Sequence, residues 1–302
     1  MAVAYAPDGT RVVGEAHGTL TVTPPGGPEA TLDLGRHWFG GELAISPDGT
    51  LLAAASRHPG GPNDPGRVHV WDLRSREPLA VLELDAGSAS ALAFAPDGTR
   101  LSAVSSSSAL PGGSGDDESE NGGSENAGAE TGVTLTTWRT SDIADGDAAA
   151  TATAQLEDDV VDAVYAPGGE NLIAASVTGR IQIRDVADGT LRREFGTHPS
   201  AVRALALAPD GRTVATATTD DGAVRLWNLD DGALRARLDS GRGFEINALA
   251  YSPDGSMLAR AGSDAAVAVW RVDAAAAAER ICRSLIDVGR ADPGCDDLGT
   301  GA

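Results

Sequence analysis

Short runs of alternating apolar and polar residues recur along the chain, and many of them lead into turns rich in proline, aspartate and glycine. In the best-formed example, the run 204–207 leads into the turn 209–211, and further runs follow at 214–218, 224–227 and 233–238. Proline presets φ for the turn, and glycine supplies a positive φ at little steric cost. Alternation with a period of two is typical of half-buried strands. The pattern therefore predicts four short antiparallel strands joined by tight turns.

This unit occurs six times. The turn prolines are Pro7, Pro47, Pro96, Pro167, Pro209 and Pro253, which gives spacings of 40, 49, 71, 42 and 44 residues. Three of the five spacings fit the ~40–45 residues of a four-stranded propeller blade. We therefore predict an all-β propeller of six four-stranded blades over residues 1–272. The last blade has no visible fourth strand after Trp270, so either the ring closes by packing alone or residues upstream of Met1 are missing.

The third strand of three repeats ends on a recurring motif. The segments 70–73, 226–229 and 269–272 read VWDL, LWNL and VWRV. They resemble the signature of the WD-repeat β-propeller family. The resemblance covers residues 1–272 and implies a propeller that binds other proteins. It does not identify the partner, because a fold by itself does not define one.

In that family a buried hydrogen-bonding set braces each blade: a histidine before the first strand, a serine or threonine in the second, an aspartate in a turn, and the tryptophan. The positions of this chain that match are His198, Thr216 or Thr218, Asp221, Trp227, Asp264 and Trp270. Asp221 precedes Trp227 by six residues, as the resemblance requires. The resemblance implies that these residues are structural rather than catalytic.

Two insertions lengthen the connection between the second and third strands, at residues 57–66 and 105–132. The second is built of Ser, Gly, Asn, Asp and Glu, a composition that buries too little apolar surface to offset its ordering entropy. We therefore expect residues 105–132 to be disordered. Both insertions are expected on the same face of the propeller, and insertions in repeat proteins often mark the binding face.

Acidic residues are concentrated around the second insertion. Residues 105–162 hold 13 Asp and Glu against the single Arg139, which supplies 12 of the net 21 negative charges. The acidic face predicted from this segment consists of Asp116, Asp117, Glu118, Glu120, Glu157, Asp158 and Asp159. Two interpretations remain open: a solvated loop that keeps the protein soluble, or a patch that steers a basic partner.

The overall composition narrows the classes of partner and location. A net charge of −21 disfavours nucleic acid and anionic membrane surfaces, because phosphate binding needs a positive surface. No apolar run approaches the ~18 residues of a membrane span, and residues 1–10 lack the features of a secretory signal. These observations predict a cytoplasmic protein. Lysine is absent among the 23 basic residues, which excludes a phosphate-loop or Schiff-base lysine.

Nothing in the sequence indicates catalysis, a cofactor or a metal site. The five histidines, at positions 17, 37, 58, 69 and 198, lack ligand spacing, and no Gly-x-Ser-x-Gly motif is present. Cys282 and Cys295 are the two cysteines. They are free thiols if the protein is cytosolic, or a disulfide that brackets a short turn.

Residues 273–302 differ from the rest of the chain, because the run after Val272 has helical propensity. We expect a short C-terminal helix and tail. Together with Pro293 and Cys295, this segment resembles the tail of WD-repeat domains in large actinobacterial signalling proteins. Abundant Ala, Gly and Arg without Lys also suggests a GC-rich bacterial genome.

These observations favour a non-catalytic protein-interaction scaffold that presents loops on one propeller face. The alternatives are a propeller enzyme with a site in the central channel, a sensor fragment of a larger multidomain signalling protein, and a structural fragment without activity of its own. The enzyme alternative needs polar groups on the first strands, which read AVAYA, ELAIS, ALAFA, DAVYA, RALALA and NALAY and so carry few.

Overall fold

The computed structural model describes residues 2–15, 17–35, 38–57, 65–85, 87–106, 132–147, 149–157, 160–239, 245–264 and 266–272, with the backbone alone at 38 and 40. The chain divides into two compact units, Met1–Pro199 and Ser200–Ala302, which are described separately. Among the described residues, no helix is long and apolar enough to cross a membrane.

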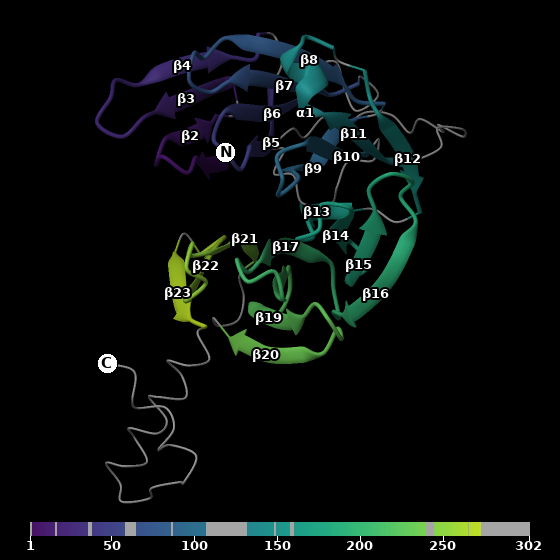
Figure 1. The fold of residues 1–302 in the computed structure, drawn as a ribbon. Helices are drawn as coiled ribbons and strands as arrows, with labels where there is room; N and C mark the ends of the chain where they lie inside the picture. The colour runs from purple at the N-terminus through teal and green to yellow at the C-terminus, as the bar shows by residue number, and fades with distance from the viewer. Residues whose placement is uncertain are drawn as a thin grey trace, which may run out of the picture. The chain divides into compact units, whose positions relative to one another are not determined.

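The first unit contains four antiparallel sheets of four strands each, here called blades 1 to 4 (Figure 1). Blade 1 consists of β1 (Ala2–Tyr5), β2 (Arg11–Gly14), β3 (Thr19–Thr23) and β4 (Ala30–Asp33). Blade 2 consists of β5 (Trp38–Ile45), β6 (Leu51–Arg57), β7 (Arg67–Asp72) and β8 (Pro78–Glu83). Blade 3 consists of β9 (Ser88–Phe94), β10 (Arg100–Ser106), β11 (Val133–Arg139) and β12 (Ala152–Leu156). Blade 4 consists of β13 (Val160–Tyr165), β14 (Asn171–Ser176), β15 (Arg180–Asp185) and β16 (Leu191–Thr197).

The second unit contains blades 5 and 6. Blade 5 consists of β17 (Val202–Leu207), β18 (Thr213–Thr218), β19 (Ala223–Asn228) and β20 (Leu234–Asp239). Blade 6 consists of β21 (Ile246–Tyr251), β22 (Met257–Gly262) and β23 (Val267–Arg271), with no fourth strand among the described residues. The predicted all-β propeller class with six blades is confirmed. Among the described residues the last blade has three strands, whereas each of the other blades has four.

The turns between the first two strands are built as their sequence predicts. In blade 2, the amide of Gly49 donates to the carbonyl oxygen of Ser46, and Gly49 has a φ of 72°. Asp48 accepts a hydrogen bond from the amide of Thr50 at 3.1 Å. A short acidic side chain that bonds the backbone two residues ahead is the usual device of such turns.

These turns lie next to one another within each unit. A Cβ added to Gly49 would be 3.0 Å from Cδ of Pro7, and one added to Gly169 would be 3.9 Å from Cδ of Pro96. In the second unit, Gly255 lies similarly close to Pro209. Consecutive Pro-Asp-Gly and Pro-Gly-Gly turns therefore occupy one side of each unit, which we call the turn side.

The blades pack through two chemically different faces. The trailing face of a blade, which covers the next blade, carries small residues; in blade 5 these are Ala204, Ala206, Ala215, Ala217, Val224 and Leu226. The leading face, which contacts the preceding blade, carries larger residues; in blade 6 these are Leu249, Tyr251, Leu258 and Trp270. The same arrangement joins blade 2 to blade 3, where Ala53 and Val70 share a core with Phe94 and Trp138. These two interfaces thus fit aromatic side chains against smaller aliphatic ones.

Polar contacts also link neighbouring blades. The hydroxyl oxygens of Ser102 in blade 3 and Tyr165 in blade 4 are 2.6 Å apart, and Ser102 also lies 2.7 Å from the hydroxyl of Thr137. Burial raises the pKa of Tyr165 to about 12, so this residue stays protonated. The Ser90 hydroxyl donates to the carbonyl oxygen of Val160 at 2.6 Å. These buried groups are satisfied across the interface, as buried polar atoms must be.

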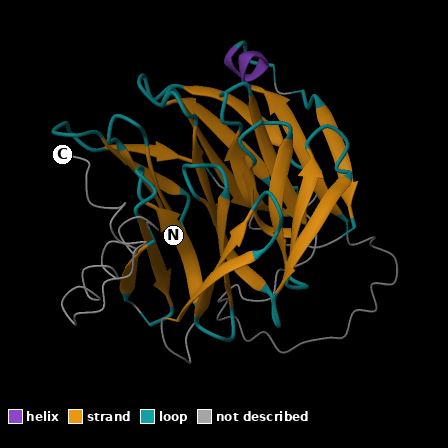
Figure 2. Ribbon diagram, turned by 60° about the horizontal axis from the view of Figure 1, so that its bottom comes forward, coloured by secondary structure: helices purple, strands orange, loops and turns teal. Residues whose placement is uncertain are grey.

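One helix was not predicted. The helix α1 (Thr140–Ala144) lies between β11 and β12 of blade 3 (Figure 2). Its Ile143 is fully buried in the core shared by blades 2 and 3. Part of the long third repeat is therefore a structural connection rather than a solvated loop.

The boundaries of the acidic insertion need correction. Ser105 and Ser106 belong to β10, are buried, and pair with Thr134 and Val133 of β11. The pairing extends beyond the expected start of the insertion because β-branched partners on β11 complete the ladder. Residues 107–131, the other insertion at 58–64, and the expected helix and tail at 273–302 lie outside the described residues.

Candidate functional site

The predicted brace of blade 5 brings Trp227 and Thr216 together. The indole Nε1 of Trp227 donates to Oγ1 of Thr216 at 2.8 Å, and both side chains are buried. Trp227 lies on β19 opposite Val214 of β18, so the strand register places its indole over the second strand. The hydrogen bond satisfies two polar atoms that burial would otherwise leave unpaired.

Thr218 and Asp221 form a second contact in the same blade. The Thr218 hydroxyl donates to Oδ1 of Asp221 at 2.9 Å, and the amide of Ala223 donates to the same oxygen at 3.1 Å. Arg225 forms an ion pair with the other carboxylate oxygen. Burial alone would raise the pKa of Asp221, but the bonds from Arg225, Thr218 and the backbone outweigh it and hold that pKa below its usual value. Asp221 therefore stays charged and closes the turn between β18 and β19.

His198 lies in the first unit, whereas the other brace positions lie in the second. Its side chain is buried, and its backbone amide donates to the carbonyl oxygen of Gly179 at 2.8 Å. The structural role that the family resemblance implies for His198 stays a prediction.

Blade 6 uses a different set of residues. Arg260 occupies the position that Thr216 holds in blade 5, and it donates to Oδ1 of Asp264 at 2.6 Å. Trp270 is only half-buried, although it occupies the position of Trp227. In blade 4, Arg184 replaces the tryptophan; it is buried and donates to Gln182 at 2.7 Å. Asp264 and Trp270 thus keep the spacing of the motif without the Trp–Thr bond of blade 5 among the described contacts.

Most of the predicted acidic face cannot be placed. Asp116, Asp117, Glu118, Glu120, Asp158 and Asp159 lie outside the described residues, as do Cys282 and Cys295. Glu157 follows β12 directly and is exposed. The connections between second and third strands begin at the strand ends remote from the turn side, because the first and second strands are antiparallel. The roots of the acidic segment therefore lie opposite the turn side in blade 3.

A partly buried carboxyl group in blade 2 was missed by the sequence analysis. Glu42 lies on β5, within an irregularity of the β5–β6 pairing between Phe39 and Leu43. Gly41, just before it, has a φ of 104°, which requires glycine. Burial, with a smaller contribution from the negative charge of Asp162 on β13, raises the pKa of Glu42 to about 8. In the sequence, the glycine pair 40–41 before Glu42 could have indicated this irregular site, because glycines within strands often mark bulges.

Among the residues that the structure describes, no group of three or more His, Cys, Asp or Glu is arranged to hold a metal ion. When two carboxyl groups lie close together, the repulsion between their negative charges favours protonation of one of them. Glu42 is therefore largely protonated at neutral pH.

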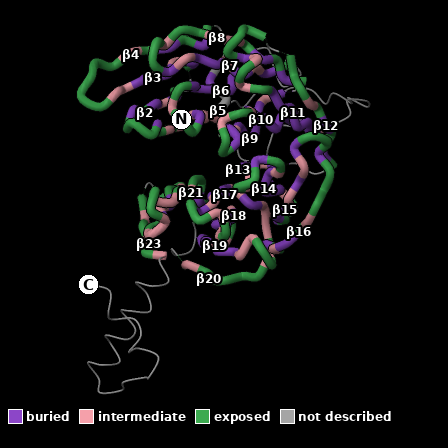
Figure 3. Tube along the Cα trace, viewed as in Figure 1, coloured by how far each residue is buried: buried purple, intermediate pink, exposed green. Residues whose placement is uncertain are grey.

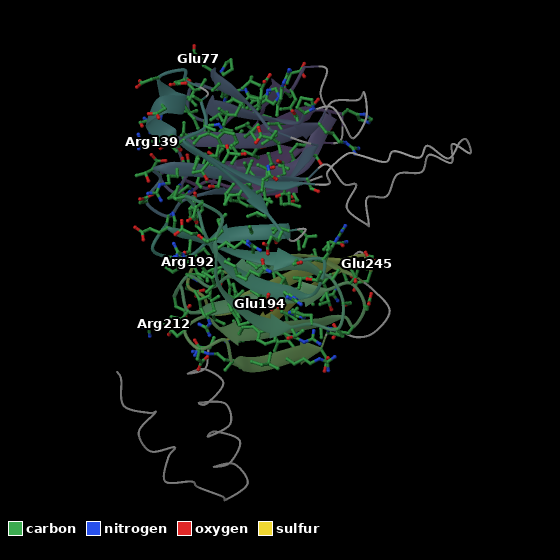
Figure 4. All side chains as sticks on the ribbon, turned by 90° about the vertical axis from the view of Figure 1, so that its right-hand side faces the viewer. Glu77, Arg139, Arg192, Glu194, Arg212 and Glu245 are labelled. Atoms are coloured by element: carbon green, nitrogen blue, oxygen red, sulfur yellow. The ribbon has the colours of Figure 1, made fainter. Side chains whose placement is uncertain are left out.

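Grooves open between neighbouring blades on the turn side. One of 420 Å³ lies between blades 3 and 4 and is lined by Arg100, Arg139, Glu170 and Asp185, among others. A second of 420 Å³ lies between blades 5 and 6, beside Asp210 and Asp254. Figure 4 shows Arg139 and Arg192 at one edge of the first unit, together with Glu77 of blade 2. Both signs of charge line each groove.

Repeated four-stranded sheets with a Pro-Asp-Gly turn after the first strand define the class of this protein as a β-propeller. Residues 189–228 and 235–271 match the family described as "WD domain, G-beta repeat". The match is limited to these two segments, so the assignment is a β-propeller fold whose matched segments are similar to WD40 repeats.

The relatives and a solved structure agree with this assignment. The chain is 36% identical over 95 residues to human WD repeat and SOCS box-containing protein 1, covering 32% of this chain and 23% of that protein. It is 28% identical over 107 residues to the rice small ribosomal subunit protein RACK1y, covering 35% of this chain and 31% of that protein. The chain thus matches less than a third of the length of either protein.

A chain in a crystal structure of the mitotic checkpoint complex shares the fold. Its TM-score is 0.68 at 16% identity, over 90% of this chain and 75% of that one. An identity this low supports the fold alone. The two relatives above are eukaryotic, and neither similarity points to a bacterial source.

Proposed function

We propose that this chain is a non-catalytic scaffold that binds a basic segment of another protein through the acidic insertion of blade 3. WD40 propellers generally act as protein-interaction scaffolds. The observation that carries the proposal is charge: residues 105–162 contribute 12 of the 21 net negative charges from less than a fifth of the chain. A field of this kind raises the rate of association with an oppositely charged partner more than it raises affinity.

The described part of the fold supports this use of the insertion. Its two roots, Ser106 and Val133, are paired across the β10–β11 ladder, and both are buried. Both roots belong to a paired strand ladder, so we expect changes within residues 107–131 to leave the strands intact. The exposed Glu157 extends the negative charge beside the first strand of blade 4.

The test uses a synthetic arginine-rich peptide and three proteins: the full chain, a chain lacking residues 107–131, and a chain of full length with the six acids of that segment changed to amides. Association rates are measured from 0.1 M to 1 M salt, over which the Debye length shrinks from ~10 Å to ~3 Å. We expect a steep loss of rate with salt for the full chain and slow association for both variants. Circular dichroism checks that the strands are retained.

The neutralised chain separates charge from length. If only the deletion slows association, the segment acts through its length. If neither variant nor salt changes the rate, the segment is a solubilising linker and the proposal fails.

The chain also has the features of a sensor fragment from a larger signalling protein. The absence of lysine together with abundant Ala, Gly and Arg is the observation behind the proposed bacterial source. The proposal therefore includes a larger signalling protein, a bacterial source and a cytoplasmic location. Sequencing of the genomic region or transcript that encodes the chain tests the bacterial source and the larger protein.

A further inference from the structure

Two arginines face each other at the groove between blades 3 and 4. Arg100, the first residue of β10, is the direct cross-strand partner of Arg139, the last residue of β11. Side chains of directly opposite residues lie on the same face of a sheet, and like charges there destabilise the pairing. Both arginines line the groove of 420 Å³ and an adjoining one of 230 Å³. A chain with a net charge of −21 thus places two positive charges side by side.

Other blades carry different residues at the position of Arg139. In three of them the third strand ends on an acid or an amide that accepts a backbone amide of the following turn: Asp72, Asp185 and Asn228. Blade 6 also has an arginine there, Arg271, but its cross-strand partner is Met257. Blade 3 continues into α1 at this point, so no tight turn needs an acceptor. The arginine therefore replaces a residue whose local structural role is not needed in blade 3.

A second pair of directly opposite arginines shows how the chain offsets such repulsion. In blade 5, Arg225 of β19 is the partner of Arg237 of β20. Oδ2 of Asp221 lies 2.5 Å from Arg225 and 3.7 Å from Arg237, so one carboxylate bridges both guanidinium groups. Within the described part of the chain, neither arginine of the blade 3 pair forms an ion pair of this kind.

The side chain of Arg100 is held in place at the groove. Its Nη1 donates to the carbonyl oxygen of Gly169, in the turn of blade 4, at 3.0 Å. A guanidinium group has five N–H donors, so most of them are still available to a ligand. The nearby Asp97 is bound to Thr99, and those bonds, with a smaller contribution from Arg100, hold the pKa of Asp97 below its usual value. Arg139 is exposed at the edge of the first unit that Figure 4 shows.

The blade 4 side of the groove carries acceptors. Asp185 lines it, but Arg192 already engages this carboxylate at 2.6 Å. Arg192 lies on β16, the outer strand of the blade, which is largely exposed (Figure 3). Glu170 also lines the groove and is exposed. A peptide amide can donate to these carboxylates, whereas a phosphate group with two negative charges is repelled by them.

We propose that Arg100 and Arg139 bind a carboxylate from an acidic segment of a partner protein. This carboxylate takes the place that Asp221 holds between the two arginines of blade 5. Guanidinium groups suit the role because they bind carboxylates through two parallel hydrogen bonds. The groove volume of 420 Å³ lies within the roughly 300–1,000 Å³ of small-ligand pockets, which suits a short segment. The site lies on the turn side and does not depend on the basic partner proposed above.

The experiment titrates the purified full chain into a fluorescent peptide of alternating Glu and Ala and follows the anisotropy. The same peptide with Gln in place of Glu is the control ligand, and we expect only the Glu peptide to bind. Arg139→Asp restores the acid that blades 2 and 4 carry at this position. It should weaken binding about tenfold or more, because charge-assisted hydrogen bonds contribute enough to change affinity by that factor.

Two measurements separate this effect from unfolding and from general charge. Arg139→Asp turns a repulsive cross-strand pair into an attractive one, so its midpoint in urea unfolding should not fall below that of the wild type. Arg212→Asp is the matched control, because Arg212 is exposed on the turn of blade 5 and does not line the groove. Its affinity for the Glu peptide should equal that of the wild type.

Three results would overturn the proposal. The first is a Glu peptide that does not bind, and the second is an equal loss of binding for Arg139→Asp and Arg212→Asp. The third is competition in which inorganic phosphate binds more tightly than the peptide, which would assign the groove to a small anion. Deleting residues 107–131 removes six acids, so it should not weaken binding of the Glu peptide, although it slows association with the arginine-rich peptide. Failure of either proposal therefore leaves the other intact.

Discussion

Replacing Trp227 tests whether blade 5 is held together by the hydrogen bond between its second and third strands. Trp227 is 7% exposed, and its indole donates to the fully buried Thr216 at 2.8 Å. Trp227→Ala removes the ring and leaves a cavity, which should cost about 3–5 kcal/mol. Trp227→Phe keeps most of the packing and removes the donor, which should cost about 1–2 kcal/mol.

The matched control is Trp270→Ala in blade 6. Trp270 occupies the same strand position but is half-buried, and Arg260 replaces the threonine. Less apolar surface is lost there, so we expect a cost of about 1–2 kcal/mol. Urea unfolding followed by far-ultraviolet circular dichroism gives the free energy of unfolding without relying on tryptophan fluorescence. Equal costs for Trp227→Ala and Trp270→Ala, or an unchanged midpoint for Trp227→Ala, would refute the reasoning.

Three further predictions concern the first unit. The pKa of Glu42 is raised to about 8 from 4.5, so the protonated form favours folding: its contribution is fully present below about pH 4.5 and is lost as the pH rises through about 8. The unfolding free energy should therefore fall more between pH 5 and pH 9 for the wild type than for Glu42→Gln, by about 4 kcal/mol at most; parallel pH profiles would contradict this. Tyr165→Phe removes the 2.6 Å bond to Ser102 and should cost about 1–2 kcal/mol, whereas Tyr5→Phe at an exposed position should not shift the thermal midpoint. Ile143→Val shortens the fully buried side chain of α1 and should cost about 0.5–1.5 kcal/mol in urea unfolding; no change would mean that α1 does not contribute to the core.

The turns and the hairpins that they form could be predicted from the sequence alone. Each Pro-Asp-Gly turn combines a fixed φ, a positive φ and an acidic cap within a few residues, so the hairpins follow from neighbouring residues alone. The spacing between turns then gave the number of blades. The family resemblance implied a partner for Trp227 at Thr216 or Thr218, and the structure places the hydrogen bond at Thr216.

The registers of the paired strands depend on more than the residues next to each turn. Blades 1 and 2 both contain Pro-Asp-Gly-Thr, yet the amide of Ala6 bonds to the carbonyl of Thr10 in blade 1, whereas that of Ser46 bonds to Leu51 in blade 2. The turn of blade 1 is one residue shorter. Arg11 follows this turn and is exposed, whereas Leu51 is buried against blade 3. Register depends on which side chains a neighbour buries, since a slip of one residue exchanges the two faces.

The sequence by itself determined the strands, their turns, the blade count and the concentration of negative charge, because each of these depends on residues close together in the chain. Only the tertiary structure decided that the pKa of Glu42 is raised to about 8, that Ile143 joins the core, and that Ser105 and Ser106 extend a strand. Glu42 and Ala248 stand at the same position before their turn prolines as the buried Ala204. Burial and pKa depend on what packs against a residue, and segments far away in the chain supply that packing.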